Sequence, residues 1–243
     1  YKQGVLEPLV SYNLAWDLSA CCMSGLGHFL DVGAHVGWYT LLAASLGCQV
    51  DAIEPVPWFA ELLSENVWSA NDADIGKRVR LHRKLVGSSS DEERTMVVPT
   101  GQLAGSASVD GIFGQGLQSC GQTTACVRAS SMRVDDVQLR QDVQSCAVKV
   151  DVEGFEPEVF SGAEGFLQEH QPLVIVMELS PGFTRNWDHD GQRTRSMLEF
   201  LTVQLKYKPF LLHWDDVKTK EKVKRSDLES KAYAGTIQEL EAQ

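Results

Sequence analysis

Residues 28–37, HFLDVGAHVG, contain the stretch that decides the predicted fold. Its first half is apolar enough for a buried strand, and Asp31 lies near the carboxyl end of that strand. Gly33 and Gly37 then allow the backbone to turn sharply into a helix. In an open α/β sheet, the turn between the first strand and the first helix is where a nucleotide-like ligand lies against backbone N–H groups. The stretch therefore predicts a ligand-binding turn.

The spacing of the glycines separates two classes of ligand. Dinucleotide sites use Gly-x-Gly-x-x-Gly, and His35 occupies the place of the middle glycine here. The chain instead reads Asp31-x-Gly33-x-x-x-Gly37, which is the form used for S-adenosylmethionine. We expect the methionine arm to lie over the two glycines, in space that a side chain would fill, while the acid holds its amino group. A buried strand followed by an ordinary glycine turn is the alternative, because short motifs have many false positives.

A second acid follows at the distance that a βαβ unit requires. Residues 49–55, QVDAIEP, predict a short strand that ends on Glu54, beside Pro55. The separation from Asp31 is close to the roughly 20 residues over which such a unit returns an acid to a bound nucleoside. A carboxylate accepts hydrogen bonds and donates none, so Glu54 is a candidate acceptor for both hydroxyls of a ribose.

Residues 146–154, CAVKVDVEG, repeat the pattern, with an apolar strand that leads to Asp151 and Glu153. We expect the strands of Asp31 and Asp151 to flank the ligand crevice of a doubly wound sheet. Asp151 and Glu153 share a face if the strand stays extended, and either carboxylate could take the proton from an attacking hydroxyl. Alternatively, Glu153 caps the next helix and Asp151 orients the cofactor. Metal binding by Asp151, Glu153 and Glu178 is a weaker option, and no metal is included in the prediction.

Strand and helix patterns alternate along most of the chain. Besides the first strand, strands are expected at residues 49–55, 79–87, 95–98, 126–134, 146–154, 173–178 and 209–214, with 173–178 central and a polar helix at the C-terminus. The alternation predicts an α/β fold with a doubly wound, mostly parallel sheet. We expect one domain over residues 1–243, with a lead-in helix at 5–24 and a Gly-rich insertion at 99–125 that covers the acceptor.

Composition limits the classes of partner. A net charge of −11 and a pI near 5.0 disfavour binding to nucleic acid, because the phosphate backbone would be repelled. No apolar run approaches the roughly 18 residues of a membrane span. The oligomeric state stays open. A cytoplasmic location is favoured, although the chain begins at Tyr1 and leaves open a preceding targeting segment.

The six cysteines show no spacing typical of a zinc site. We expect mostly free thiols, because the scattered pattern is unlike that of a small disulfide scaffold. Cys120 and Cys126 are the exception, since they could bridge a hairpin in an oxidising compartment.

The chain resembles the FkbM family of S-adenosylmethionine-dependent methyltransferases over most of its length, through FLDVGAHVGWYT, DAIEPVP, SMRVDDV, VKVDVEGFEPEVFSGA and VIVMEL in that order. The family's Asp-x-Gly-Ala-x-x-Gly motif corresponds to Asp31, Gly33, Ala34 and Gly37, and its Glu-Pro pair to Glu54 and Pro55. Its more specific Lys-x-Asp-x-Glu-Gly-x-Glu motif corresponds to Lys149, Asp151, Glu153, Gly154 and Glu156. The family's usual Thr-Leu-Asp appears here as Arg133, Val134 and Asp135, and the Gly-rich insertion has no counterpart.

This resemblance implies the class I methyltransferase fold, a seven-stranded sheet with one antiparallel strand, and S-adenosyl-L-methionine as cofactor. It also implies O-methylation of a small-molecule or glycan acceptor, usually at a hydroxyl of a sugar or natural product. The candidate cofactor-binding residues are Asp31, Gly33, Ala34, His35, Gly37, Glu54, Pro55 and Asp151, and the candidate catalytic residues are Asp151 and Glu153. Two other functions stay open: a cofactor-binding module without a catalytic role and, less favoured because of His35, a nicotinamide oxidoreductase.

Overall fold

A computed structural model describes residues 6–69, 73–100, 107–109, 120–179, 184 and 188–210. The predicted strand at 209–214 lies outside these residues except for its first two positions, and so does the C-terminal helix. Most of the Gly-rich insertion also lies outside them. Among the described helices, none is both long enough and apolar enough to cross a membrane.

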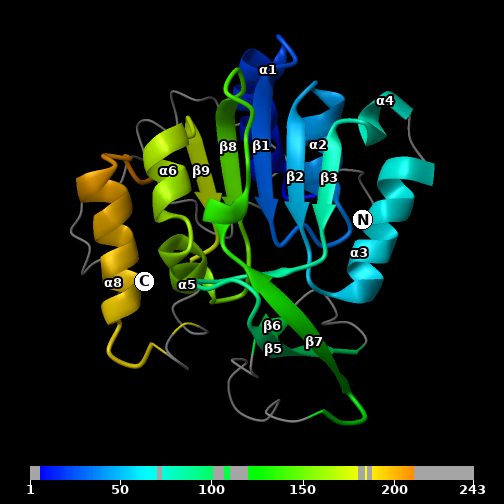
Figure 1. The fold of residues 1–243 in the computed structure, drawn as a ribbon, viewed down its shortest axis with the longest axis vertical. Helices are drawn as coiled ribbons and strands as arrows, with labels where there is room; N and C mark the ends of the chain where they lie inside the picture. Colours follow the sequence, from blue (N-terminus) through cyan, green and yellow to red (C-terminus); the bar gives the residue numbers. More distant parts are fainter. Residues whose placement is uncertain are drawn as a thin grey trace.

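The centre of the molecule is a parallel five-stranded sheet in the order β3-β2-β1-β8-β9 (Figure 1). The strands are β1 (Gly27–Val32), β2 (Gln49–Ile53), β3 (Val79–His82), β8 (Gln144–Val150) and β9 (Val174–Met177). The order reverses at β1, which pairs with β2 on one side and with β8 on the other. The predicted α/β fold is therefore confirmed at the level of a mostly parallel sheet, and β1 and β8 are neighbours as expected.

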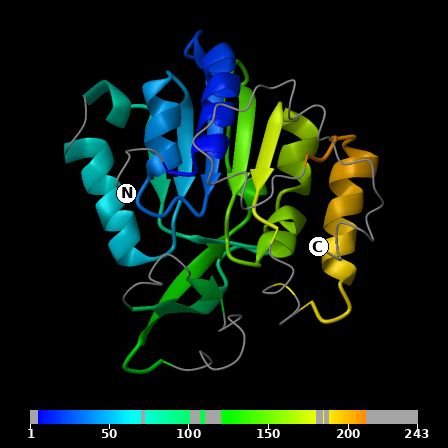
Figure 2. The same cartoon turned by 180° about the vertical axis from the view of Figure 1, so that it is seen from behind.

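Helices cover both faces of this sheet. One face carries α1 (Pro8–Cys22), α2 (Trp38–Ser45) and α3 (Pro57–Ser64), which bury apolar side chains such as Leu18, Ala43 and Leu63 against Phe29 and Ala147. Figure 2 shows α1 and α2 in front of the sheet from this side. The short α4 (Ala73–Gly76) lies beside β3 (Figure 1).

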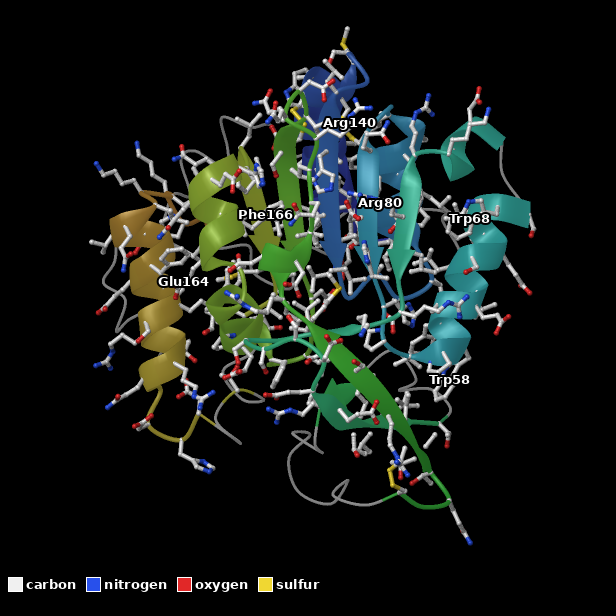
Figure 3. The ribbon with its side chains drawn as sticks, viewed as in Figure 1. Trp58, Trp68, Arg80, Arg140, Glu164 and Phe166 are labelled. Carbon is white, nitrogen blue, oxygen red and sulfur yellow. A yellow bond between two sulfur atoms is a disulfide. The ribbon has the colours of Figure 1, made fainter. Side chains whose placement is uncertain are left out.

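The other face carries α5 (Glu156–Ser161), α6 (Glu164–His170) and α8 (Gln192–Glu199). Their side chains Phe160, Phe166 and Leu198 pack with Leu30 and Val148 of the sheet, and Phe166 is labelled on α6 in Figure 3. Two helices continue into π-helical turns, Glu65–Ser69 after α3 and Phe200–Gln204 after α8. Because each face is apolar along alternating strand positions, both layers are held mainly by hydrophobic burial.

A second, four-stranded sheet departs from the prediction of one continuous layer. Its order is β4-β7-β5-β6, with β4 (Leu85–Val86), β5 (Glu93–Pro99), β6 (Ser108–Val109) and β7 (Thr124–Met132). The single strand expected at 79–87 is divided, because Leu85 leaves the central sheet and buries its side chain in the apolar cluster of the second one. The strands expected at 95–98 and 126–134 exist, but they pair antiparallel with each other.

The strand expected to be central, β9, is the edge strand among the described residues. All four of its residues are only half-buried, whereas every residue of β1 is buried. Apolar composition therefore did not predict strand position, since β1 carries His28 and Asp31 and still occupies the centre.

A buried carboxylate links three neighbouring strands of the central sheet. Asp51 of β2 accepts hydrogen bonds from His28 Nε2 of β1 at 2.9 Å and from His82 Nε2 of β3 at 2.6 Å. Arg80 of β3, labelled in Figure 3, donates to the same carboxylate at 2.5 Å. Burial alone would raise the pKa of Asp51, but the hydrogen bonds from the two histidines and Arg80 lower it well below its usual range.

All six cysteines form disulfides, so the expectation of mostly free thiols is wrong. Cys21 pairs with Cys146, Cys22 with Cys48, and Cys120 with Cys126. The first two tie the end of α1 to β8 and to the residue before β2. Spacing along the chain could not reveal this, because these partners meet only once the sheet has formed. Such pairing is typical of oxidising compartments and argues against the favoured cytoplasmic location.

Candidate active site

The glycine turn after β1 lies at the carboxyl edge of the central sheet. The N–H groups of Gly33 and Ala34 both donate to the Ile53 carbonyl at 3.0 Å, which fixes the turn against the end of β2. Gly33 has a φ of 79° and Gly37 a φ of 91°, conformations that residues with a side chain rarely adopt. Gly37 precedes the first residue of α2.

The two glycines have a packing role that was not expected. A Cβ on Gly33 would lie 1.9 Å from the carbonyl oxygen of Asp151, and a Cβ on Gly37 would lie 2.9 Å from Cγ of Leu63. Both glycines are thus required by neighbouring protein atoms, independently of any ligand. A substitution at either position would therefore affect the packing of the turn as well as any space above it.

Asp31 is buried at the end of β1 with one oxygen in use. Thr40 of α2 donates from Oγ1 to Asp31 Oδ2 at 2.7 Å, whereas Oδ1 has no hydrogen-bond partner although it is buried. Burial raises the pKa of this carboxyl, and Lys149 together with the Thr40 hydrogen bond only partly offsets the effect. An unpaired buried acceptor is costly. Asp31 Oδ1 is therefore suited to receive a donor from a ligand.

Glu54 lies directly after β2, and both of its oxygens contact the turns around it. Oε2 accepts from the N–H of His35 at 2.8 Å, and Oε1 accepts from the N–H of Val56 at 2.8 Å. Burial raises the pKa of Glu54 to about 7, against the lowering effect of these two hydrogen bonds. The side chain therefore supports the glycine turn itself, and each oxygen retains acceptor capacity for a ligand hydroxyl.

Two other predicted cofactor residues lie on the same edge. The His35 backbone is left-handed, with a φ of 50°, and its ring lies 4.2 Å from the ring of Phe59. Burial lowers the pKa of His35, which keeps the imidazole neutral. Pro55 follows Glu54 and leads toward α3, which begins at Pro57.

Lys149 and Asp151 form an ion pair beside the glycine turn. Lys149 Nζ donates to Asp151 Oδ2 at 2.8 Å, and the lysine side chain is only 6% exposed. Burial on its own would raise the pKa of Asp151, but the Lys149 charge and the hydrogen bond from Lys149 lower it. Asp151 is therefore held as a carboxylate.

Asp151 and Glu153 lie in a turn after β8, because the strand ends at Val150. Glu153 and Gly154 both have positive φ angles, 56° and 95°. Asp151 and Glu153 are expected to share a face only if the strand stays extended as far as Glu153. The strand ends earlier, so this condition is not met. The N-cap position of α5 is Phe155, whose side chain makes no capping hydrogen bond.

Glu156 supports the turn after β8. The sequence indicates this residue only as part of the family motif. Its Oε1 accepts from the N–H groups of Val152 and Gly154, both at 3.2 Å, and so holds the turn that carries Glu153. Glu156 is fully buried, and burial raises its pKa to about 7. The position of this acid two residues after a glycine is the signal that could have indicated a turn-stabilising role.

Glu153 differs from Asp151 in its electrostatic surroundings. Burial raises the pKa of Glu153 to about 8, and the nearby carboxylates of Glu178, Asp151 and Glu156 add to the effect. The ligand oxygens of Asp151, Glu153 and Glu178 lie within 4.8 Å of one another, so the three could also hold a divalent cation. Adjacent acids with pKa values shifted in opposite directions are typical of sites where one acid stays charged and the other exchanges a proton.

Comparison with protein-family models adds a decisive observation. Residues 31–209, more than half of the chain, match the methyltransferase FkbM domain. The chain belongs to the FkbM methyltransferase family. The matched region begins at Asp31 and contains the glycine turn, Glu54 and the turn after β8, whereas α1 precedes it. The match confirms the resemblance to this family seen in the sequence.

Comparisons with individual proteins are less informative for the FkbM domain. No curated protein matches the chain. A solved structure, the methyltransferase FkbM from Methylobacillus flagellatus KT, is 20% identical with a TM-score of 0.44. The match covers 71% of this chain and 36% of that protein, so this chain spans about a third of the solved one.

The second sheet packs against the turns that carry the candidate site of the FkbM domain, which the sequence did not predict. Its apolar cluster includes Val98 and Val127 and packs against Phe59 of α3 and Phe155 after β8. Val36 of the glycine turn packs against the same cluster. Figure 1 shows this sheet at the edge to which the arrowheads of β1, β2 and β8 point. The second sheet therefore contacts both the glycine turn and the region after β8.

Proposed function

We propose that this chain is an S-adenosylmethionine-dependent methyltransferase that acts on a hydroxyl oxygen of a small molecule or a sugar. The observation that carries the proposal is the unpaired, buried Oδ1 of Asp31, close to a second acid pair at the neighbouring strand end. The family supports methyl transfer. The cofactor and the acceptor class are inferred from the chemistry of the residues.

The hydrogen-bond acceptors of the site fit the proposed cofactor. Asp31 Oδ1 would accept a hydrogen bond from the ammonium of the methionine arm, which relieves the cost of an unpaired buried oxygen. Glu54 would accept from the ribose hydroxyls while it continues to hold the His35 and Val56 N–H groups. The turn after Asp31 contains Gly33, Ala34, His35 and Gly37. Pro55 directly follows Glu54.

Asp151 and Glu153 have different roles on the acceptor side of the site. Bound S-adenosylmethionine supplies an electrophilic methyl group on its sulfonium. Asp151, ionised by Lys149, gives the site a fixed negative charge beside the glycine turn. Glu153 has a pKa of about 8 and so can both take up and release a proton near neutral pH. We assign Glu153 the role of the base that removes the proton of the attacking hydroxyl.

Hydroxyl acceptors suit this arrangement better than anionic ones. Five acidic side chains lie at one edge of the sheet: Asp31, Glu54, Asp151, Glu153 and Glu178. A polyanionic acceptor would be repelled by them, whereas a sugar or polyol can donate hydrogen bonds to them. The same groups favour a substrate that approaches with O–H donors.

A calorimetric titration tests the cofactor, and a labelling assay tests the reaction. S-adenosylmethionine and S-adenosylhomocysteine should bind, NAD should not, and Asp31→Asn should weaken binding at least tenfold because it alters the charged acceptor. Glu164→Gln, an exposed acid on α6, is the matched control. Incubation with methyl-labelled cofactor and a panel of sugars and polyols then identifies the acceptor. Binding without transfer to any acceptor class would favour a module without catalytic activity.

A further inference from the structure

Helix α1 precedes the region that matches the family and still contacts the site. Glu7, directly before the helix, accepts a hydrogen bond at Oε2 from the hydroxyl of Tyr39 at 2.5 Å. Ser11 of α1 accepts a second one at Oγ from Trp38 Nε1 at 3.0 Å. Trp38 and Tyr39 are the first residues of α2 and follow Gly37 of the glycine turn. The start of α1 therefore holds the start of α2.

The ring of Tyr39 provides a surface for the buried lysine of the site. Lys149 Nζ lies 4.8 Å from the centroid of this ring, and both residues are 5% exposed. An ammonium over an aromatic face is attracted by the ring quadrupole, most strongly where water is excluded. The same Nζ donates to Asp151. Lys149 is thus held between an aromatic ring and a carboxylate.

We propose that Tyr39 is a positioning residue of the active site: its ring keeps Lys149 against Asp151, and Glu7 keeps the ring in place. The catalytic part of this proposal rests on the proposed function, whereas the electrostatic part does not. The proposal extends the site to a residue of the chain outside the family-matched region, since Glu7 precedes residue 31.

The charges around Lys149 define the measurable consequence. Its ammonium faces Asp151 after β8, Asp31 of β1 and Glu7 before α1. Glu153 is surrounded by Glu178, Asp151 and Glu156, and the Lys149 charge is the one that lowers its pKa. If the ring is lost, Lys149 is no longer confined beside Asp151. The pKa values of Asp151 and Glu153 should then rise together.

Three variants separate positioning from packing. Tyr39→Leu removes the ring, and Tyr39→Phe keeps the ring but removes its hydrogen bond to Glu7. Trp38→Phe is the matched control, because it removes a hydrogen bond across the same α1–α2 junction and leaves Tyr39, Glu7 and Lys149 intact. Carboxyl ¹³C NMR titrations of aspartate- and glutamate-labelled protein report the pKa values, with Asp151→Asn and Glu153→Gln for assignment.

We expect Tyr39→Leu to raise both pKa values by about one unit, Tyr39→Phe to raise them by less, and Trp38→Phe to leave them unchanged. With an active acceptor, kcat should fall about tenfold in Tyr39→Leu, and the rising limb of its pH profile should move to higher pH. Unchanged pKa values in the two Tyr39 variants overturn the proposal, whatever the activity. If Tyr39→Leu does not fold, Tyr39→Phe decides alone. Shifted pKa values without any methyl transfer would retain the positioning role and reject the proposed function.

Discussion

Gly33 lies directly against the backbone of Asp151, so closely that a Cβ on Gly33 would be 1.9 Å from the Asp151 carbonyl oxygen. The N–H of Asp151 in turn donates to the carbonyl of Val32 at 3.1 Å. The glycine turn and the acidic turn thus pack directly against each other where the strand order reverses.

Gly33→Ala should lower the free energy of unfolding by about 2 kcal/mol or more, because it adds both a steric overlap and a strained φ. Gly25→Ala is a matched control, since Gly25 has a similar φ of 72° with no atom within 4 Å of the added Cβ. Chemical denaturation of both variants measures the difference. Equal losses in the two proteins would show that the contact with Asp151 contributes nothing.

Glu54→Ala should weaken S-adenosylhomocysteine binding at least tenfold, because charge-assisted hydrogen bonds contribute about 1.5 to 3 kcal/mol each. Since the pKa of Glu54 is about 7, native affinity should also fall between pH 8 and pH 6, and the Ala variant should lose this dependence. Glu61→Ala, an exposed acid on α3, should bind normally.

Analogues that lack a ribose hydroxyl test the same assignment more directly by calorimetry. The analogue should bind the native protein less well than the full ligand does. In Glu54→Ala the two ligands should bind alike. An equal loss in both proteins would place the ribose elsewhere.

Glu153→Gln should reduce turnover about a hundredfold or more with little change in cofactor affinity, because it removes the base and keeps the shape. A base acts when deprotonated, so native turnover should rise with pH up to about 8 and then level off. A pH–rate profile in single-turnover conditions measures both effects. A native profile without a rise near pH 8 would exclude Glu153 as the base.

Ionisation of Glu153 should lower the stability of the folded chain as the pH rises, whereas it should raise turnover. The pKa of Glu153 is raised in the folded chain, so the stability associated with the protonated form is fully present below about 4.5, the ordinary pKa of a glutamate, and is lost as the pH rises through about 8. Glu153→Gln cannot ionise and should be more stable than the native protein at pH 9, with little difference at pH 4. Thermal denaturation at the two pH values checks the sign.

The disulfides should be present in the isolated protein and should differ in their contribution to stability. Mass spectrometry after alkylation without reduction should find no modified cysteine. Cys21→Ala/Cys146→Ala opens a loop with a sequence separation of 125, whereas Cys120→Ala/Cys126→Ala opens one of 6. The first pair should cost more, about 3 to 5 kcal/mol, because long loops regain more entropy when opened. A larger loss for the second pair would contradict this order.

Local patterns were enough to predict the central strands and the positions of their acids. Asp31, Glu54 and Asp151 each follow a short apolar run, and the helix after each run requires the next strand to be parallel. Their convergence follows from topology alone. The sequence could therefore predict that these acids meet at one edge of the sheet.

The remaining features depend on contacts between distant residues. The second sheet requires β5 to pair antiparallel with β7 and β4 to leave the central sheet, and no local period encodes either event. The turn at Glu153 depends on Glu156 reaching back to two N–H groups. Likewise, the pairing of Cys21 with Cys146 depends on α1 packing against β8.

Two neighbouring disulfides have a consequence for how the chain matures. Cys22 Sγ lies 3.7 Å from Cys146 Sγ, although each is bonded to a different cysteine. A thiolate on any one of the four cysteines can attack a neighbouring disulfide and pass the free thiol to another sulfur. Exchange among these four sulfurs can therefore join Cys22 to Cys146 in place of the two pairs in the structure. A thiol catalyst that reshuffles such isomers would restore the native pairs.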